Sequence, residues 1–330
     1  MTTLLQDPEW RAARLALPRG RPRVVIDTDA ANEIDDQFAL AWALLSPQQL
    51  AIEAMYAAPF SFAHRRASLG FTPRDERPFV PPAVGMERSF EEIVRVQALC
   101  GGVAAVPVLR GSAGYLPAAE QALPSAAAED LIARAGAMPD DEPLYVLVLG
   151  CPTNVASALL LAPQIAERIV VVWTSGYPSH APQPNHSFNL EQDLHATRVL
   201  LGSGVPLVYL PGFHVGAQLR LSLPEVERWV QHEGAIGAYL HHLFTHNPLW
   251  EMQGVRDFFA HSWVIWDLIC VAWLLQPDWV PSELVPTPAL DADQRWQPRP
   301  GAPLMRQAYA VKRDAVFRDL FGKLASRASS

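Results

Sequence analysis

Lysine is almost absent from this chain of 330 residues. Of its 26 basic residues only Lys312 and Lys323 are lysines, and the rest are arginines. A mechanism built on a catalytic or phosphate-binding lysine would therefore have to use a residue near the C-terminus. The chain also lacks a GK[ST] sequence, and no GxGxxG motif follows its first predicted strand. These absences argue against a P-loop enzyme and against a dinucleotide-binding enzyme.

Cysteine and positive charge are also scarce. The three cysteines (Cys100, Cys151 and Cys270) lie far apart and form no CxxC pair. They cannot make a disulfide framework, so a reducing compartment fits. The 34 acidic residues outnumber the basic ones and give a net charge of −8. This balance argues against a surface that coats nucleic acid.

No long apolar run marks an export signal or a membrane span. The first twenty residues carry acids and arginines where a signal peptide needs an apolar stretch. The most apolar late run, 262–275, contains Asp267 and is shorter than the roughly 18–20 apolar residues that a spanning helix needs. Hydrophobic residues nevertheless make up 50% of the chain, which suits a large buried core rather than disorder. We expect a cytoplasmic protein that binds neither a membrane nor nucleic acid.

Short β-branched runs alternate with longer amphipathic segments along most of the chain. This alternation predicts an α/β fold, with a mostly parallel sheet flanked by helices. After Ser222 the pattern is mostly helical and predicts a helical C-terminal cap, with a final helix over about 304–324. We expect one domain over 1–330, with the core and cap in 22–276 and a C-terminal extension in 277–330. The predicted strands are 23–27, 51–57, 106–109, 144–149, 169–173 and 206–210, and the predicted helices between them are 35–45, 89–100, 126–135, 154–161 and 190–201.

Two segments, 59–88 and 178–189, have no clear periodicity. A loop of that length inside a compact domain is usually either functional or mobile.

Four aspartates surround the end of the first predicted strand. Asp27 and Asp29 end the strand, and Asp35 and Asp36 begin the next helix. Singly, Asp35 would suit a helix cap and Asp27 a satisfied buried acid. Together, four carboxylates at one turn repel one another strongly unless a cation neutralises them. Oxygen ligands favour Ca²⁺ or Mg²⁺ over zinc, and the carboxyl ends of strands are where sites form in open α/β sheets. The group therefore predicts a metal site.

The sequence around these aspartates resembles a known family. VVIDTDAANEIDDQ is similar to the DxDxxxDD fingerprint of the nucleoside hydrolases, the inosine–uridine-preferring N-ribohydrolases. LVLGCPTN resembles the family's segment with a Gly-Pro-Leu-Thr-Asn core. FNLEQDLHATRVLLGSGVPLVYLP is similar to its Glu-Phe-Asn segment, and SWVIWDLICVAWLL to its late His-Asp helix. The resemblance spans about 23–276, and the longer aspartate turn is similar to that of a divergent branch of the family.

The resemblance implies a calcium-dependent glycosidase that releases base and ribose from a nucleoside. Asp29 would be both a metal ligand and the base that takes a proton from the attacking, metal-bound water. Asp36 would be the bidentate calcium ligand, Asp267 a late carboxylate ligand, and the carbonyl of Leu149 a backbone ligand. The chemistry is consistent, because carboxylates near the ribose stabilise an oxocarbenium-like state and a cation lowers the pKa of bound water.

Other matching positions would bind or brace the substrate. Asp35 would bind the 2′- and 3′-hydroxyls of the ribose, and Asn189 would hold the sugar. Asp27 would support the aspartate cluster, and Asn154 would brace the turn that presents Leu149. A homo-oligomer is expected from the resemblance alone.

The chain departs from the family pattern at several of these places. Two extra residues lengthen the aspartate turn, so Asn32 or Glu33 could reach the substrate. Ser187 stands where a glutamate is expected before Phe188-Asn189, so one sugar contact is lost or moved. Trp266 stands where some members have a histidine that helps to protonate the leaving base. An indole cannot supply that proton, although Trp266 could line the substrate site.

The sequence allows more than one role for several histidines and tryptophans. His242 and His246 have metal-binding spacing, but no third ligand is evident, so helix-surface or site-rim positions are favoured for them and for His241. His241 or His246 could replace the missing acid. Trp173, Trp250, Trp263 and Trp266 could form an aromatic wall for a base or belong to the core. The core is the favoured interpretation for Trp263.

Two other functions are compatible with parts of the sequence. In a haloacid dehalogenase-type phosphatase, Asp27 would attack phosphorus and Asp29 would act as the acid. That class needs a threonine after the pair and a mid-chain lysine, whereas Ala30 and Ala31 follow here. Alternatively, Ser187 and Trp266 would suit a degenerate relative that binds calcium and a ribosyl ligand without turnover.

Overall fold

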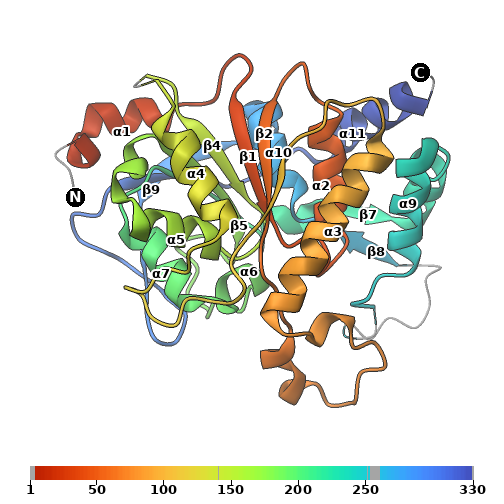
Figure 1. The fold of residues 1–330 in the computed structure, drawn as a ribbon, viewed down its shortest axis with the longest axis horizontal. Helices are drawn as coiled ribbons and strands as arrows, with labels where there is room; N and C mark the ends of the chain where they lie inside the picture. The colour runs from red at the N-terminus through yellow and green to blue at the C-terminus, as the bar shows by residue number, and fades with distance from the viewer. Residues whose placement is uncertain (1–3, 140, 251, 253–260, 329–330) are drawn as a thin grey trace.

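An eight-stranded sheet forms the centre of the molecule (Figure 1). The computed structural model describes residues 4–139, 141–250, 252 and 261–328. The strand order is β3-β2-β1-β4-β5-β6-β12-β9, and only β9 pairs antiparallel with its neighbour within this described sheet. This confirms the predicted α/β class. The strands are β1 Arg23–Thr28, β2 Ala51–Ala57, β3 Val108–Arg110, β4 Leu144–Val148, β5 Ile169–Ser175, β6 Leu207–Pro211, β9 Ser282–Pro286 and β12 Leu304–Ala308.

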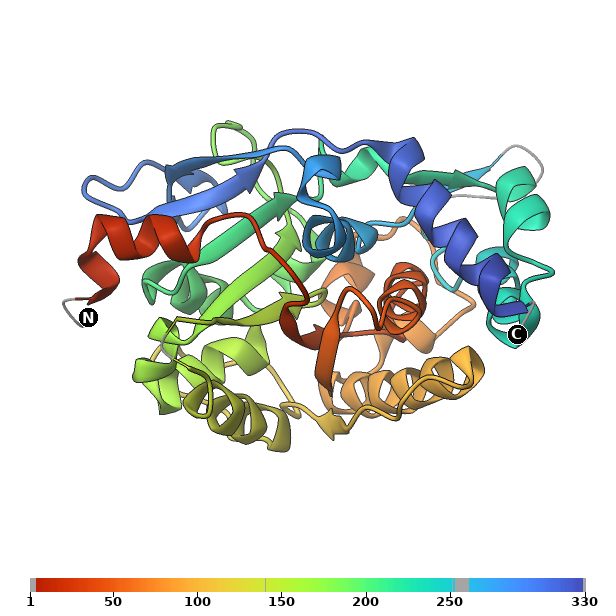
Figure 2. The ribbon, with the colours of Figure 1, turned by 90° about the horizontal axis from the view of Figure 1, so that it is seen from above.

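Helices cover both faces of this sheet, and each face has its own apolar core (Figure 2). Successive strand residues point to opposite faces: Val24 and Ile26 belong to one core and Val25 to the other. Burial on both faces explains why the central strands are almost continuously apolar. The core on one face includes residues of α2 Asp35–Leu44, α3 Pro82–Cys100, α9 Gly234–Thr245, α10 Leu268–Leu275 and α11 Arg313–Ala328, and the core on the other includes residues of α4 Ala126–Gly136, α5 Thr153–Leu161 and α7 Leu194–Gly202.

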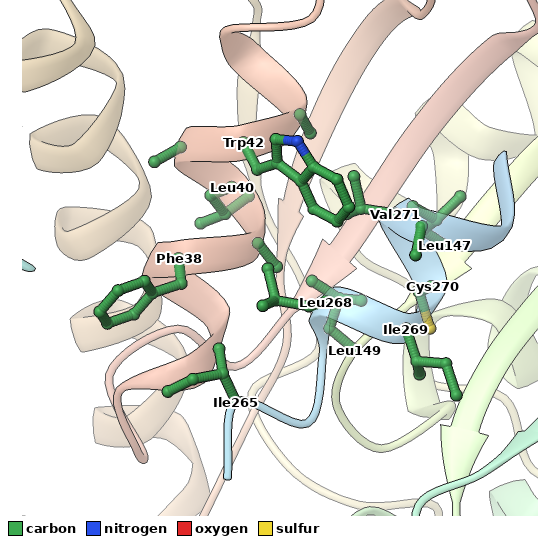
Figure 3. Close-up of a cluster of buried hydrophobic side chains, with 14 of the residues drawn as sticks. Phe38, Leu40, Trp42, Leu147, Leu149, Ile265, Leu268, Ile269, Cys270 and Val271 are labelled. Atoms are coloured by element: carbon green, nitrogen blue, oxygen red, sulfur yellow. The ribbon is translucent and has the colours of Figure 1, made fainter. Parts of the chain in front are cut away.

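Helices α2 and α10 are almost entirely enclosed. Phe38 and Trp42 of α2 and Leu268 of α10 lie in one cluster with Leu147 of β4 (Figure 3). Because α10 is buried on all sides, its sequence is apolar all round. This burial accounts for the apolar run over 262–275. In the described part of the chain, no helix combines the length and the apolar character that crossing a bilayer requires.

Several predicted elements begin or end elsewhere. Helix α3 starts at Pro82 rather than Ser89, because proline fits the first turn of a helix. Two 3-10 turns, η2 Ala63–Ser68 and η3 Arg77–Phe79, precede it. They lie in the segment that extends from the lower end of the molecule in Figure 1. The helix predicted over 190–201 is divided into α6 Phe188–Glu191 and α7, because the side chain of Asp193 caps α7. The N-terminal residues form α1 Pro8–Arg14.

The C-terminal third is less helical than its sequence predicts. The final helix predicted over 304–324 exists but begins later, at Arg313, and Leu304–Ala308 is strand β12 instead. Pairing with the open edge of β6 stabilises the extended form there, so tertiary context decides the structure. The expected extension after residue 276 thus adds β9 and β12 to the main sheet. The remaining elements include helix α8 Leu223–Trp229 and the strand pairs β7 Arg220–Ser222 with β8 Ser262–Val264 and β10 Ala289–Leu290 with β11 Trp296–Gln297.

Candidate active site

A pocket of about 390 Å³ lies where the parallel strands end. Asp29 follows β1 and Leu149 follows β4, while Thr174 is the last residue but one of β5 and Gly212 follows β6; all four line the pocket. This is the position at which open α/β sheets bind their ligands. The pocket is formed by residues that the sequence separates by more than two hundred positions.

Three carboxylates gather at one end of the pocket. Asp35, Asp36 and Asp267 offer oxygen atoms that all lie within 4.8 Å of one another, and each side chain is buried. Asp35 and Asp36 belong to the first turn of α2, and Asp267 precedes the first residue of α10. The packing of α2 against α10 therefore brings residues from the two ends of the chain together. Asp35, which we predicted to bind ribose, lies in the same group as two predicted metal ligands.

Asp29 lines the same pocket but lies outside that group of three. Its Oδ2 accepts hydrogen bonds from Asn32 Nδ2 at 2.5 Å and from Gln192 Nε2 at 3.3 Å. Its Oδ1 is buried and has no hydrogen-bond partner among the described residues. Asn32 comes from the lengthened aspartate turn, so the two additional residues bring a donor to Asp29. The amide that we predicted to contact substrate thus contacts a carboxylate in this structure.

Asp27 and Asn154 form a second layer behind the pocket. Asn154 Nδ2 donates to Asp27 Oδ1 at 2.8 Å, and Asn154 Oδ1 accepts from the backbone nitrogen of Ser112 at 2.7 Å. Asn154 therefore ties the end of β1 to the loop after β3. The predicted supporting residue Asp27 lies beside the backbone of β4, because its carbonyl accepts from the Leu149 nitrogen at 2.8 Å.

Asn189 lies at the ends of β4 and β5. Its Nδ2 donates to the carbonyl oxygens of Leu149 and of Thr174, the latter at 3.2 Å. The predicted sugar-binding residue and the predicted backbone ligand are thus in direct contact, and both line the pocket.

Burial dominates the electrostatics of the acidic group. It raises the pKa values of Asp29, Asp35 and Asp267 well above their ordinary range, and the neighbouring carboxylates raise them further. Burial likewise raises the pKa of Asp36 to about 6. Burial and mutual repulsion thus make ionisation of these acids unfavourable. The fixed, all-oxygen donor set fits a hard divalent cation, which would favour the ionised form of each acid.

Aromatic residues line another part of the pocket. Trp266 lines it and contacts Phe213 edge-on, with 6.0 Å between ring centroids. Trp263 is buried yet also lines it, and its Nε1 donates to the carboxylate of Glu33. Trp173 belongs to the core, where its Nε1 donates to the Gly150 carbonyl at 3.2 Å.

The loops without periodicity supply residues that the sequence reasoning missed. Phe62 and Phe188 stack with centroids 3.8 Å apart, and Arg65 lies over both rings. All three line the pocket. Their location in two long irregular segments was the available signal, whereas nothing in the sequence pointed to Gln192.

The three histidines considered above as replacements for the acid or as metal ligands lie elsewhere. His241, His242 and His246 are not among the described residues that line the pocket. The rings of His242 and His246 stack on each other, with 4.2 Å between centroids. The geometry therefore offers no support for either His241 or His246 as the missing acid.

Comparisons with known proteins agree on one family. The sequence profile described as "Inosine-uridine preferring nucleoside hydrolase" matches residues 24–316. The chain is 29% identical over 264 residues to the non-specific ribonucleoside hydrolase RihC of Salmonella enteritidis, covering 77% of this chain and 79% of that protein. The structure of a purine-preferring ribonucleoside hydrolase from Gardnerella vaginalis superposes with a TM-score of 0.69 at 18% identity. That superposition covers 93% of this chain and 99% of the other.

Replacing Gly150 by alanine should displace Asp29. A Cβ at Gly150 would lie 2.8 Å from Asp29 Cγ and 2.9 Å from its Oδ1, and the carboxylate end is the group that can move. We expect Gly150→Ala to fold but to bind Ca²⁺ at least about tenfold more weakly by calorimetry. Gly136→Ala is the matched control, because nothing lies within 4 Å of its Cβ position. Equal affinities for Ca²⁺ in both variants would contradict this placement of Asp29.

Replacing Asp36 by asparagine should stabilise the metal-free protein above neutral pH. Since the pKa of folded Asp36 is raised from 3.8 to about 6, its ionisation destabilises the fold above that pH, and the loss disappears as the pH falls toward 4. In a chelator at pH 8 we expect Asp36→Asn to gain on the order of 2 kcal/mol in unfolding free energy. At pH 5 the gain should be smaller.

Thermal and denaturant unfolding at both pH values measure this difference. Asp314→Asn serves as the control, because the Asp314 side chain is 82% exposed. A less stable Asp36→Asn at pH 8 would contradict the electrostatic account.

Proposed function

The chain belongs to the inosine-uridine preferring nucleoside hydrolase family, and we propose that it hydrolyses the N-glycosidic bond of a ribonucleoside or nucleoside-like metabolite with Ca²⁺ as cofactor. The observation that carries the proposal is the group of buried carboxylates in a pocket at the carboxyl ends of the strands. Its oxygen donors suit a hard ion, and its volume suits a small molecule.

Four groups would hold the ion. Asp36 and Asp267 offer oxygens close enough to share one ion. Asp29 and Leu149 line the same pocket, and Oδ1 of the first and the carbonyl of the second complete the proposed set. When bound, the cation orients the ribose diol and makes a water molecule more acidic.

Asp29 is the proposed base. Its Oδ1 has no hydrogen-bond partner among the residues that the structure describes, so it can accept the proton of the attacking water. As the glycosidic bond breaks, positive charge develops on the ribose, and the carboxylates of Asp29 and Asp35 stabilise it. Asp35 would bind the sugar hydroxyls, while Asn189 lies between two strand ends, where it would fix the sugar's orientation.

Leaving-group activation differs from the family pattern. Trp266 lines the pocket at the predicted histidine position and presents an indole, which donates through nitrogen but does not titrate. We propose that Trp266 contacts the base by stacking rather than by protonation. The tryptophan at this position also favours a second candidate function, in which the protein binds calcium and a ribosyl ligand without turnover.

The phosphatase alternative has no support in the pocket. Neither Lys312 nor Lys323 is among the described residues that line it. Asp27 Oδ1 is engaged by Asn154 behind the pocket, where it could not attack a phosphorus atom.

Three further proposals concern the whole molecule. The three cysteines are free and buried, which supports the proposal that the protein functions in the reducing cytoplasm. β9 and β12 join the central sheet, which supports a single domain over 1–330. The proposal of a homo-oligomer rests on the family resemblance.

A screen for ribose release over purine and pyrimidine nucleosides, with and without chelator, tests the function. We expect release from at least one nucleoside and its loss with chelator. Asp36→Ala should abolish both ion binding and turnover, because it removes a central ligand. Asp35→Ala should raise KM while retaining the ion.

Two results would contradict parts of this account. Full activity of Asp36→Ala would exclude the assignment of the metal site. Thermal stabilisation by Ca²⁺ without ribose release from any nucleoside would favour the non-catalytic binder.

A further inference from the structure

The two carboxylate oxygens of Asp29 have different surroundings. Oδ2 accepts hydrogen bonds from two side-chain amides, those of Asn32 and Gln192. Oδ1 accepts none from the described residues, although it is buried. A buried carboxylate oxygen without a donor is costly unless an ion or water reaches it. Only Oδ1 is therefore open to such a group.

Gln192 is itself held in one orientation. The hydroxyl of Tyr115 donates to Gln192 Oε1 at 2.8 Å, so Nε2 is the atom that faces Asp29. A flipped amide would place Oε1 against the carboxylate, lose the hydrogen bond to Asp29 and reverse the one to Tyr115. The backbone is also fixed here, because Asp193 caps α7 and accepts from the Leu116 nitrogen at 2.9 Å.

Gly150 lies on the Oδ1 side of Asp29 and leaves space there because it has no side chain. Gly150 lies so near that a Cβ there would be 2.9 Å from Oδ1. With Oδ2 tied by two donors, the carboxylate has little freedom to rotate. Gln192 thus acts on Oδ2, the oxygen of Asp29 that is not the proposed ligand atom.

We propose that Gln192, oriented by Tyr115, is a positioning residue that leaves Asp29 only one carboxylate oxygen, Oδ1, for the ion and the water. Together with Asn32 it occupies Oδ2, so Asp29 contributes only Oδ1 to the bound ion and leaves room there for a water. This inference rests on the proposed function, in which Asp29 is both ligand and base. Without these donors both oxygens are free, and carboxylates bind hard ions readily through two oxygens.

The number of water molecules on the bound ion tests the inference without activity. Tb³⁺ replaces Ca²⁺ in the full-length protein, and its luminescence decay in H₂O and D₂O counts the coordinated waters. We expect the double variant Asn32→Ala/Gln192→Met to bind Tb³⁺ with about one water fewer than the wild type, because Asp29 would use both oxygens. Its kcat for ribose release should fall about 10- to 100-fold, with a much smaller change in KM.

Tyr115→Phe provides a second test if the double variant fails to fold. It frees the Gln192 amide to rotate, so kcat should fall to an intermediate value while the fold is retained. Gln307→Met is the matched control, since Gln307 is equally buried but lies on β12 and bonds to the Ser179 nitrogen. The control should keep the wild-type hydration and kcat.

An unchanged water count and kcat in the double variant, or in Tyr115→Phe if the double variant is unfolded, would overturn the inference. Failure of the wild type to bind Tb³⁺ would overturn it as well. If the water count falls while the wild type releases no ribose, the positioning role stands and the proposed enzymatic function fails.

Discussion

The mutual repulsion of buried carboxylates is the constraint on which this site depends. Asp35 and Asp36 begin α2, and Asp267 begins α10, so the packing of two apolar helices forces their acidic ends together. Burial makes ionisation of these acids unfavourable, and their proximity makes it more so. The apolar contacts of α2 and α10 therefore hold in place a group that would separate if it were free. The proposed divalent cation would resolve this conflict and would link binding to stability.

The side-chain hydrogen-bond donors to Asp27 and Asp29 are neutral amides rather than cationic groups. Asn154 donates to Asp27, while Asn32 and Gln192 donate to Asp29. An amide fixes the direction of a carboxylate without neutralising its charge, so the site retains its demand for a cation. A lysine at the same place would have removed that demand. The scarcity of lysine in the chain is consistent with this arrangement.

The sequence predicted the central sheet and the acidic turn because both have local signals. Buried parallel strands are continuous apolar runs, and Asp29, Asp35 and Asp36 lie within eight residues of one another. The prediction of Asp267 as a late ligand came from resemblance, since no local pattern distinguishes it from any acid at the start of a helix. Strand β12 was mistaken for a helix because its extended form depends on pairing with β6, which no local pattern records.

Gln192 and Tyr115 could not be predicted for a related reason. Their role depends on where the loop after β3 and the turn before α7 meet, and this meeting is a product of the whole fold. Phe62, Arg65 and Phe188 were indicated only as parts of irregular segments. The sequence thus predicted the acidic residues at the strand end. It did not predict the side chains that orient these acids or enclose the pocket.

A crystal structure of the protein grown with Ca²⁺ tests the central claim most directly. The account predicts one ion in contact with carboxylate oxygens of Asp36 and Asp267 and with Oδ1 of Asp29, while Oδ2 of Asp29 stays on its two amides. An ion bound at another place, or a pocket that excludes Ca²⁺ at saturating concentration with the acids protonated, would contradict it.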